Sequence, residues 1–202
     1  MKKRSLLIAL FMMAIVLLSA CEQEKEPNPF VGKWSGSMDL TNQFVQNFIV
    51  QNPSLKEYVQ FENLMITLEC TFAEDSISFA MNETSGKQFV SNFETGVTNM
   101  VDTMVADVAA DNNTTPENVY AAMNVTREDF IQSKIDSMDL EQMINALKKA
   151  YDLEGEYEYD EDSIFVYYED DTFEEMHYSF QGDILSLTLS DGNSTQVVEF
   201  AK

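Results

Sequence analysis

The stretch GEYEYDEDSIFVYYEDDTFEEMHYSFQGDILSLTLS, residues 155–190, decides the fold. Within it, apolar or aromatic side chains occupy alternate positions, and short runs rich in Asp, Glu, Gln and Gly separate the alternating segments. A period of two is typical of a β-strand with one buried face, and Gly at a hairpin tip accepts a positive φ without strain. The stretch therefore predicts four consecutive antiparallel strands.

The same alternation occurs before and after this stretch. We expect eight strands in all, at about 31–40, 62–73, 75–82, 155–160, 163–169, 172–181, 183–190 and 194–201. Eight short antiparallel strands in sequence close naturally into an up-and-down barrel, because closure removes exposed sheet edges. The predicted fold class is a β-rich α+β protein built on an eight-stranded antiparallel up-and-down barrel.

Between the third and fourth strands the period changes to that of a helix. Phe89, Phe93 and Val97 begin an apolar series at helical spacing. We expect a helical insert at about residues 86–150, and a further helix or two within residues 42–60.

Two features of the insert bear on its structure and its use. Thr114 and Glu117 have the spacing of a capping box, and Thr126 indicates a further helix start. The insert is also rich in methionine, a flexible side chain that suits adaptable binding surfaces. These methionines are Met100, Met104, Met123, Met138 and Met143.

The N-terminus carries an export pattern. Residues 2–4 are basic, residues 6–18 are mainly apolar, and Leu18-Ser19-Ala20-Cys21 resembles the lipobox of bacterial lipoproteins. The apolar run is shorter than the roughly 20 residues that span a bilayer. The resemblance implies a signal peptide at residues 1–20 and acylation of Cys21 with palmitate-type chains.

This resemblance also implies a domain order and a location. Residues 21–29 would form a lipidated flexible tether, and residues 30–202 the barrel domain with its insert. The protein would be anchored by lipid in the cell membrane or outer membrane of the envelope, with the domain on the extracytoplasmic side. The membrane would be a partner through the lipid alone.

Charge excludes one class of partner. The chain has 12 basic and 35 acidic residues, and residues 1–20 hold three of the basic ones, so the chain after cleavage has a formal charge of −26. Such a field repels phosphate groups, so we expect no nucleic-acid partner.

The first predicted strand carries Gly32-Lys33-Trp34, which resembles the Gly-x-Trp motif that opens lipocalins. The resemblance implies a lipocalin-like barrel whose closed end is plugged by the Trp. Lipocalins pack a late Arg on this Trp, whereas Arg127 of the insert is the only Arg of the chain after residue 20.

Chemistry-bearing residues are few. His177 has no nucleophile motif near it. Cys70 lies among alternate apolar residues, so we expect a buried and inert thiol. We expect the acidic runs 160–162 and 169–171 to be solvated hairpin tips rather than calcium sites. We expect no catalytic residue, no metal and no cofactor, and hence no enzyme.

Two functions remain open. In the first, the barrel binds a small apolar or amphipathic ligand within it or at its mouth. The candidate lining residues are Trp34, Met38, Ile66, Leu68, Phe79, Met81, Met176, Tyr178 and Phe180. In the second, the barrel is filled, and the insert or a barrel face binds another envelope protein. A hollow interior of several hundred Å³ favours the first.

Overall fold

The computed structural model describes residues 27–190 and 195–202. The chain divides into two units, and the second, Val31–Lys202, holds every helix and strand described below. In the first unit, the Phe30 amide donates to Asn28 Oδ1 at 3.1 Å. The predicted signal peptide and Cys21 lie outside the described residues.

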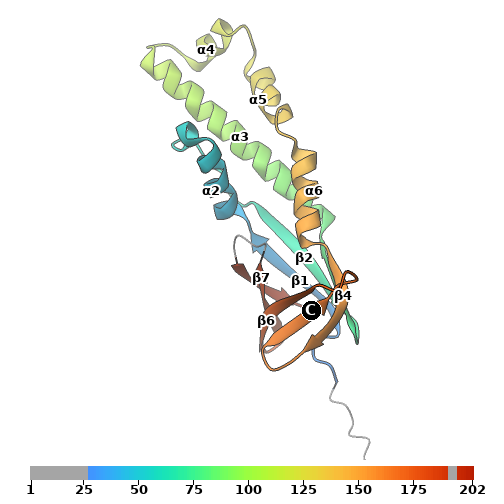
Figure 1. Ribbon diagram of the computed structural model, residues 1–202. Coiled ribbons are helices and arrows are strands. Elements are labelled where there is room, and N and C mark those ends of the chain that lie inside the picture. Colours follow the sequence, from blue (N-terminus) through green and yellow to red (C-terminus); the bar gives the residue numbers. More distant parts are fainter. Residues whose placement is uncertain (1–26, 191–194) are drawn as a thin grey trace, which may run out of the picture. The chain divides into compact units, whose positions relative to one another are not determined.

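Eight antiparallel strands form a closed barrel in chain order, and the last strand returns to pair with the first (Figure 1). Consecutive strands are neighbours throughout, which is the up-and-down topology. The predicted fold class is confirmed. The strands are β1 (Gly32–Asp39), β2 (Met65–Phe72), β3 (Ser76–Met81), β4 (Leu153–Tyr159), β5 (Ser163–Tyr167), β6 (Phe173–Gln181), β7 (Ile184–Ser190) and β8 (Thr195–Ala201).

Burial follows the alternation that predicted the strands. Every second residue of β1 from Trp34 onward is buried, and β2 repeats this pattern. Trp34 lies opposite Cys70 in the β1–β2 ladder, and Met38 lies opposite Ile66. Because side chains at successive positions point to opposite faces, the apolar set of each strand faces the barrel interior.

The barrel closes where β1 meets β8, and the close approach there requires glycine. Gly36 lies opposite Phe200, and a Cβ at this position would stand 2.8 Å from the Glu199 carbonyl oxygen. The absence of a side chain at Gly36 makes room for the ring of Phe200, which is fully buried.

A lysine occupies the face of the barrel tryptophan. Lys202 Nζ lies 4.5 Å from the centroid of the Trp34 ring and donates to the Val31 carbonyl oxygen at 3.1 Å. A cation over an indole face is attracted by the ring quadrupole. Lys202 thus stands where the lipocalin resemblance implies an Arg.

The helices interrupt the barrel at two points in the chain. Between β1 and β2 lie α2 (Thr41–Gln51) and a short 3₁₀ turn, η1 (Pro53–Leu55). Between β3 and β4 lie α3 (Glu83–Asp111), α4 (Pro116–Ala122), α5 (Arg127–Asp136) and α6 (Leu140–Tyr151). Both groups lie where the change of period predicted helix.

The helix starts correct one detail of the sequence prediction. The N-cap of α4 is Thr115 rather than Thr114, and its Oγ1 accepts from the Asn118 amide at 3.4 Å. The physical reason is Pro116, which occupies the first helical position and leaves the cap to the residue before it. Thr126 caps α5 as predicted, accepting from the Asp129 amide at 3.0 Å.

The helices of the described residues leave and re-enter the barrel at one end. β1 ends at Asp39, which pairs with Met65 at the start of β2, and Phe79 near the end of β3 pairs with Leu153 at the start of β4. The helices therefore gather beyond this end, with α3 running between α2 and the α5–α6 pair (Figure 1).

Candidate functional site

The predicted barrel lining forms a packed core. Seven of the nine side chains are at most 6% exposed: Trp34, Met38, Ile66, Leu68, Phe79, Met81 and Met176. A pocket bordered by Leu68, Phe79 and Met176 has a volume of only about 60 Å³. This volume is far below the roughly 300–1,000 Å³ of ordinary ligand sites.

The remaining two residues lie toward the other end of the barrel, beside the tryptophan. The ring of Phe180 is 6.1 Å from that of Trp34, and the side chain is 36% exposed. Tyr178 is half-buried and donates its hydroxyl to the Asp160 carbonyl oxygen at 2.8 Å. The Tyr178 ring lies 5.8 Å from that of Phe180, so the two rings and the tryptophan form one aromatic cluster.

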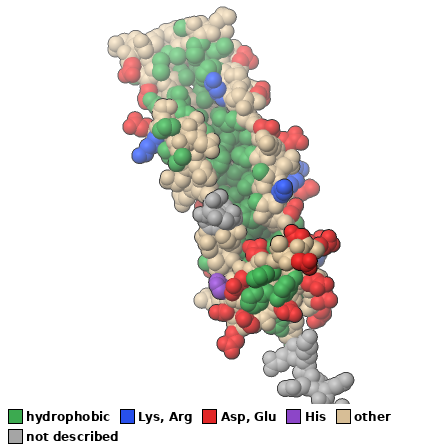
Figure 2. Space-filling view, viewed as in Figure 1, with side chains coloured by type: hydrophobic (Ala, Val, Ile, Leu, Met, Phe, Trp, Pro, Cys, Tyr) green, Lys and Arg blue, Asp and Glu red, His purple; other side chains and the backbone are tan. Residues whose placement is uncertain are grey.

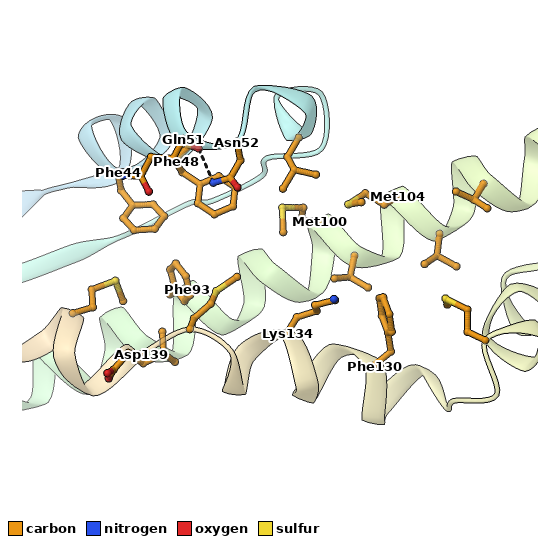
Figure 3. Close-up of a pocket in the computed structure, with 18 of the residues that line it drawn as sticks. Phe44, Phe48, Gln51, Asn52, Phe93, Met100, Met104, Phe130, Lys134 and Asp139 are labelled. Carbon is orange, nitrogen blue, oxygen red and sulfur yellow. Dashed lines mark hydrogen bonds between the residues drawn. The ribbon is translucent and has the colours of Figure 1, made fainter.

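The helices border a much larger apolar space, of about 710 Å³, which is open to solvent on one side (Figure 3). We call it the helical groove. It is lined by Phe44, Phe48, Gln51, Asn52, Leu55, Phe93, Met100, Val101, Met104, Val105, Val108, Val119, Met123, Phe130, Lys134, Met138, Asp139, Leu140 and Met143. All five methionines noted in the sequence are in this set.

The helical groove exists because the helices do not complete one another's core. α3 buries one face, which includes Phe89, Phe93 and Val97. In α2 and α6 no residue is buried, although α6 is strongly amphipathic. The apolar faces of these helices converge on the groove at half exposure, and Figure 2 shows the resulting band of hydrophobic side chains over the helices.

Aromatic rings form the wall nearest the barrel. The Phe61 ring stacks on Phe93 with a centroid separation of 5.1 Å, and Phe44 meets both rings edge-on at 5.1 and 5.2 Å. Phe48 adds a further edge contact to Phe61 at 5.4 Å. Edge-to-face pairs at these distances are favourable beyond their buried area, so these contacts stabilise the aromatic wall.

Two charged side chains line the groove. Asp139 is the N-cap of α6, and its Oδ1 accepts from the Gln142 amide at 2.8 Å. Lys134 Nζ lies 4.9 Å from the centroid of the Phe130 ring. Figure 3 shows the lysine reaching from α5 into the space between the helices.

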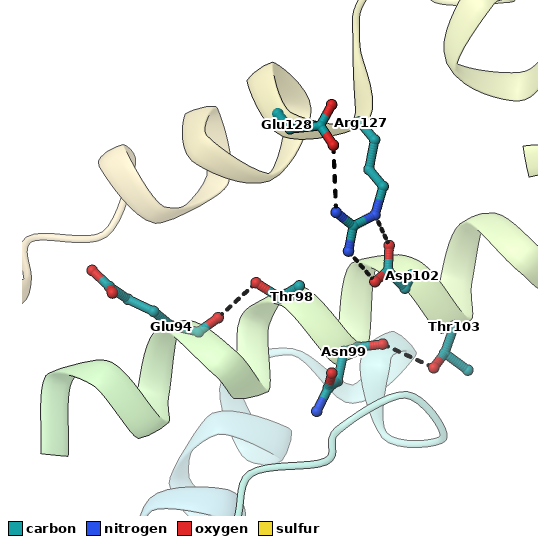
Figure 4. A network of polar contacts seen from close by, with 7 residues as sticks. All are labelled: Glu94, Thr98, Asn99, Asp102, Thr103, Arg127 and Glu128. Atoms are coloured by element: carbon teal, nitrogen blue, oxygen red, sulfur yellow. Dashed lines mark hydrogen bonds and ion pairs between the residues drawn. The ribbon is translucent and has the colours of Figure 1, made fainter. Parts of the chain in front are cut away.

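An ion pair at the far end of the groove positions α5 against α3 (Figure 4). Arg127 Nε donates to Asp102 Oδ1 at 2.8 Å, and a second nitrogen of the guanidinium contacts Oδ2 of the same carboxylate. The hydrogen bond to Asp102 raises the pKa of Arg127. This two-point contact sets the direction in which α5 presents Phe130 and Lys134, which lie on its next turns.

A buried hydroxyl lies in the same region. The Tyr120 side chain is 5% exposed, and its hydroxyl oxygen has no hydrogen-bond partner among the described residues. Burial raises the pKa of this hydroxyl, and the Asp102 carboxylate raises it further.

The other chemistry-bearing residues take structural roles in the described part of the chain. His177 is exposed, and its Nδ1 lies 3.0 Å from the Oγ of buried Ser163, which also donates to Glu175 Oε1 at 2.9 Å. The Glu175 carboxylate contacts the serine rather than the histidine. In a hydrolytic triad the acid contacts the histidine and the histidine contacts the serine, so these three residues do not form one.

The acidic hairpin tips cap turns. Asp160 Oδ1 accepts from the Ser163 amide at 3.0 Å, and Asp170 Oδ1 accepts from the Thr172 amide at 3.1 Å. Within residues 27–190 and 195–202, no group of three or more His, Cys, Asp or Glu side chains is arranged to hold a metal ion.

Sequence reasoning placed the candidate site in the barrel and did not predict the groove between the helices. The methionine content of the insert was the available signal. The contribution of α2, which comes from a different part of the chain, carried no such signal.

Comparisons with known proteins return nothing for this chain. No protein-family model, no curated protein and no solved structure matches it. Among the described residues, no helix has the length and apolar character needed to cross a membrane.

Proposed function

We propose that this protein is a lipid-anchored, non-enzymatic protein of the bacterial envelope whose helical groove binds a small apolar or amphipathic molecule. The observation that carries the proposal is the groove itself, with about 710 Å³ of space walled by phenylalanine and methionine. This volume lies within the usual range for small-molecule sites, and adaptable methionine walls accommodate more than one ligand shape.

The anchor part of the proposal is supported by the sequence. The lipobox at Cys21 would attach the chain to the membrane surface, and two or more acyl chains make such attachment stable. The formal charge of −26 after cleavage would hold the domain away from anionic lipid headgroups, which leaves the groove free for a ligand.

The ligand proposal is tested with the chain lacking residues 1–20 and carrying Cys21→Ser. We expect uptake of the uncharged fluorescent probe 1-N-phenylnaphthylamine at micromolar concentration, and loss of that uptake in Met143→Glu, which places a charge in the groove wall. The matched control is Val197→Glu, which alters an exposed apolar residue of the barrel. Failure of the unsubstituted chain to bind the probe would refute a ligand site.

The anchor is tested by mass spectrometry of the N-terminal peptide from cells that express the full chain. We expect a diacylglycerol-modified Cys21, and a soluble, unmodified chain from Cys21→Ser. An N-terminus that begins elsewhere without lipid would contradict the anchor.

A second candidate function is favoured by the packed barrel. In this reading the apolar faces of α2 and α6 bind another envelope protein. The distinguishing result is a purified chain that takes up no probe but forms a stoichiometric complex with one defined partner, abolished by Met143→Glu and retained by Val197→Glu.

A further inference from the structure

The helical groove extends along α3. Its lining residues on α3 run from Phe93 to Val108, which is about 22 Å of helix at 1.5 Å per residue. The lining of this apolar space therefore follows one helix over several turns. An extended hydrocarbon chain suits such a lining.

The two charged side chains of the groove wall differ in whether they already have a partner. The Asp139 carboxylate is committed to capping α6. The Lys134 ammonium forms no ion pair with any carboxylate that the structure describes, and it lies over the Phe130 ring. Lys134 is the one basic residue among the described side chains that line the groove.

We propose that the occupant of the helical groove is a single-chain amphiphile with an anionic head group, and that Lys134 binds the head while the chain lies along α3. This inference rests on the proposed function, and it names the ligand class of the same site. The Phe130 ring holds the ammonium at the edge of the apolar space, where a head group stays in water while its tail is buried.

The two parts of the ligand are both required. The strong negative charge of the protein repels small free anions, so Lys134 alone binds none tightly. Burial of the hydrocarbon chain supplies most of the binding free energy, and it places the head group beside Lys134, the basic residue of the groove lining.

The test is displacement of 1-N-phenylnaphthylamine by matched 12-carbon compounds below their aggregation concentrations. The compounds are dodecanoate, dodecyl phosphate, dodecan-1-ol and dodecyltrimethylammonium. We expect the chain with Cys21→Ser to bind the better anion about tenfold more tightly than the cation. Preference for the carboxylate points to a fatty acid, and preference for the phosphate points to a lysophospholipid-type head; both outcomes support the proposal.

The decisive variants change the lysine and leave the apolar wall intact. Lys134→Met should bind the anions about tenfold more weakly and dodecan-1-ol unchanged, while Lys134→Arg should retain the preference. Lys149→Met is the matched control, because Lys149 is exposed on α6 and is not part of the groove lining.

Failure of this inference is distinguishable from failure of the proposed function. If anion, alcohol and cation bind equally and Lys134→Met changes none of them, the anionic head group is refuted, while continued uptake of the probe still supports a ligand site.

Sedimentation in the same buffer tests whether a second copy of the chain is the occupant. A dimer that forms at the expense of probe binding would mean that a second copy fills the groove, and would overturn the proposal.

Discussion

The barrel and the helical insert contain similar apolar side chains but bury them to different extents. In β2, the three inward residues Ile66, Leu68 and Cys70 are fully buried. In α6, an amphipathic helix of similar apolar content on one face, no residue is buried. In a closed barrel the inner faces of opposite strands pack against each other. In the insert, no further helix of the described residues packs over the apolar faces of the helices that line the groove.

This difference separates a stable scaffold from a surface that is available for binding. The barrel side chains have no space left to admit a ligand, while those around the groove lose exposure only when something binds there. The predictions below test this contrast, starting with the largest expected effect.

The largest effect should be seen in the reactivity of the barrel thiol. Cys70 is fully buried, and burial raises the pKa of its thiol, so little reactive thiolate forms in the folded barrel. In the chain with Cys21→Ser, we expect Cys70 to react with a thiol reagent at pH 8 about 1,000-fold more slowly in the native state than in denaturant, because reaction requires unfolding. Rapid native labelling would show that the barrel opens readily.

Matched phenylalanine truncations should affect the two regions differently. Phe200→Ala removes a fully buried ring that contacts Phe79, and we expect a loss of about 3–5 kcal/mol in the free energy of unfolding in urea. Phe48→Ala removes a half-buried ring of the groove wall and should cost about 1 kcal/mol, while weakening probe binding. Equal losses would mean that the insert is packed as tightly as the barrel.

The pH dependence of stability should carry a signature of the buried thiol. Above the ordinary thiol pKa of about 8.5, the unfolded chain releases the proton that folded Cys70 retains. The contribution of the protonated thiol to the free energy of unfolding is therefore fully present below that pH. Above it, this contribution falls by up to about 1.4 kcal/mol per pH unit. The measurement is the free energy of unfolding from pH 7 to 10 under reducing conditions. The variant Cys70→Ala should lack this part of the slope.

A side chain at Gly96, where α3 meets the aromatic wall, should destabilise the fold. A Cβ there would overlap the ring of Phe61, an overpacking that costs about 1–3 kcal/mol and exceeds the roughly 1 kcal/mol that alanine gains in a helix. We expect Gly96→Ala to lose about 1 kcal/mol by urea denaturation. Thr95→Ala, at the exposed neighbouring position, should change stability by less than about 0.5 kcal/mol.

The smallest effect compares one buried tyrosine hydroxyl in each region. Tyr120 of the insert has no hydrogen-bond partner among the described residues, whereas Tyr157 of β4 donates to the Ala73 carbonyl oxygen at 3.0 Å. Removing an unpaired buried hydroxyl is neutral or stabilising. We expect Tyr120→Phe to gain up to about 1 kcal/mol and Tyr157→Phe to lose about 1 kcal/mol in thermal or urea unfolding. A loss in Tyr120→Phe would indicate a water-bridged hydroxyl.

Much of the fold was predictable from local patterns. Strands such as β7 appear in the sequence as alternating leucines bounded by turn residues, and a hairpin brings such a pattern together over a few positions. Caps such as Thr126 are equally local. The one misplaced cap, Thr114, shows the limit of this approach, since one residue decides which of two threonines precedes Pro116.

The candidate site was predictable only in part. The five methionines of the insert were visible, but their position opposite Phe44 and Phe48 of α2 depends on how segments 40 or more residues apart are brought to one end of the barrel. The approach of Lys202 to Trp34 likewise joins the two ends of the domain.

The sequence by itself determined where strands and helices form and which face of each is apolar, because periodicity is a property of neighbouring residues. Only the tertiary structure decided that the barrel interior is full and that the space lies among the helices. A cavity is the difference between the volume that the backbone encloses and the volume of the side chains within it. That difference depends on the packing of every element at once, so no local pattern records it.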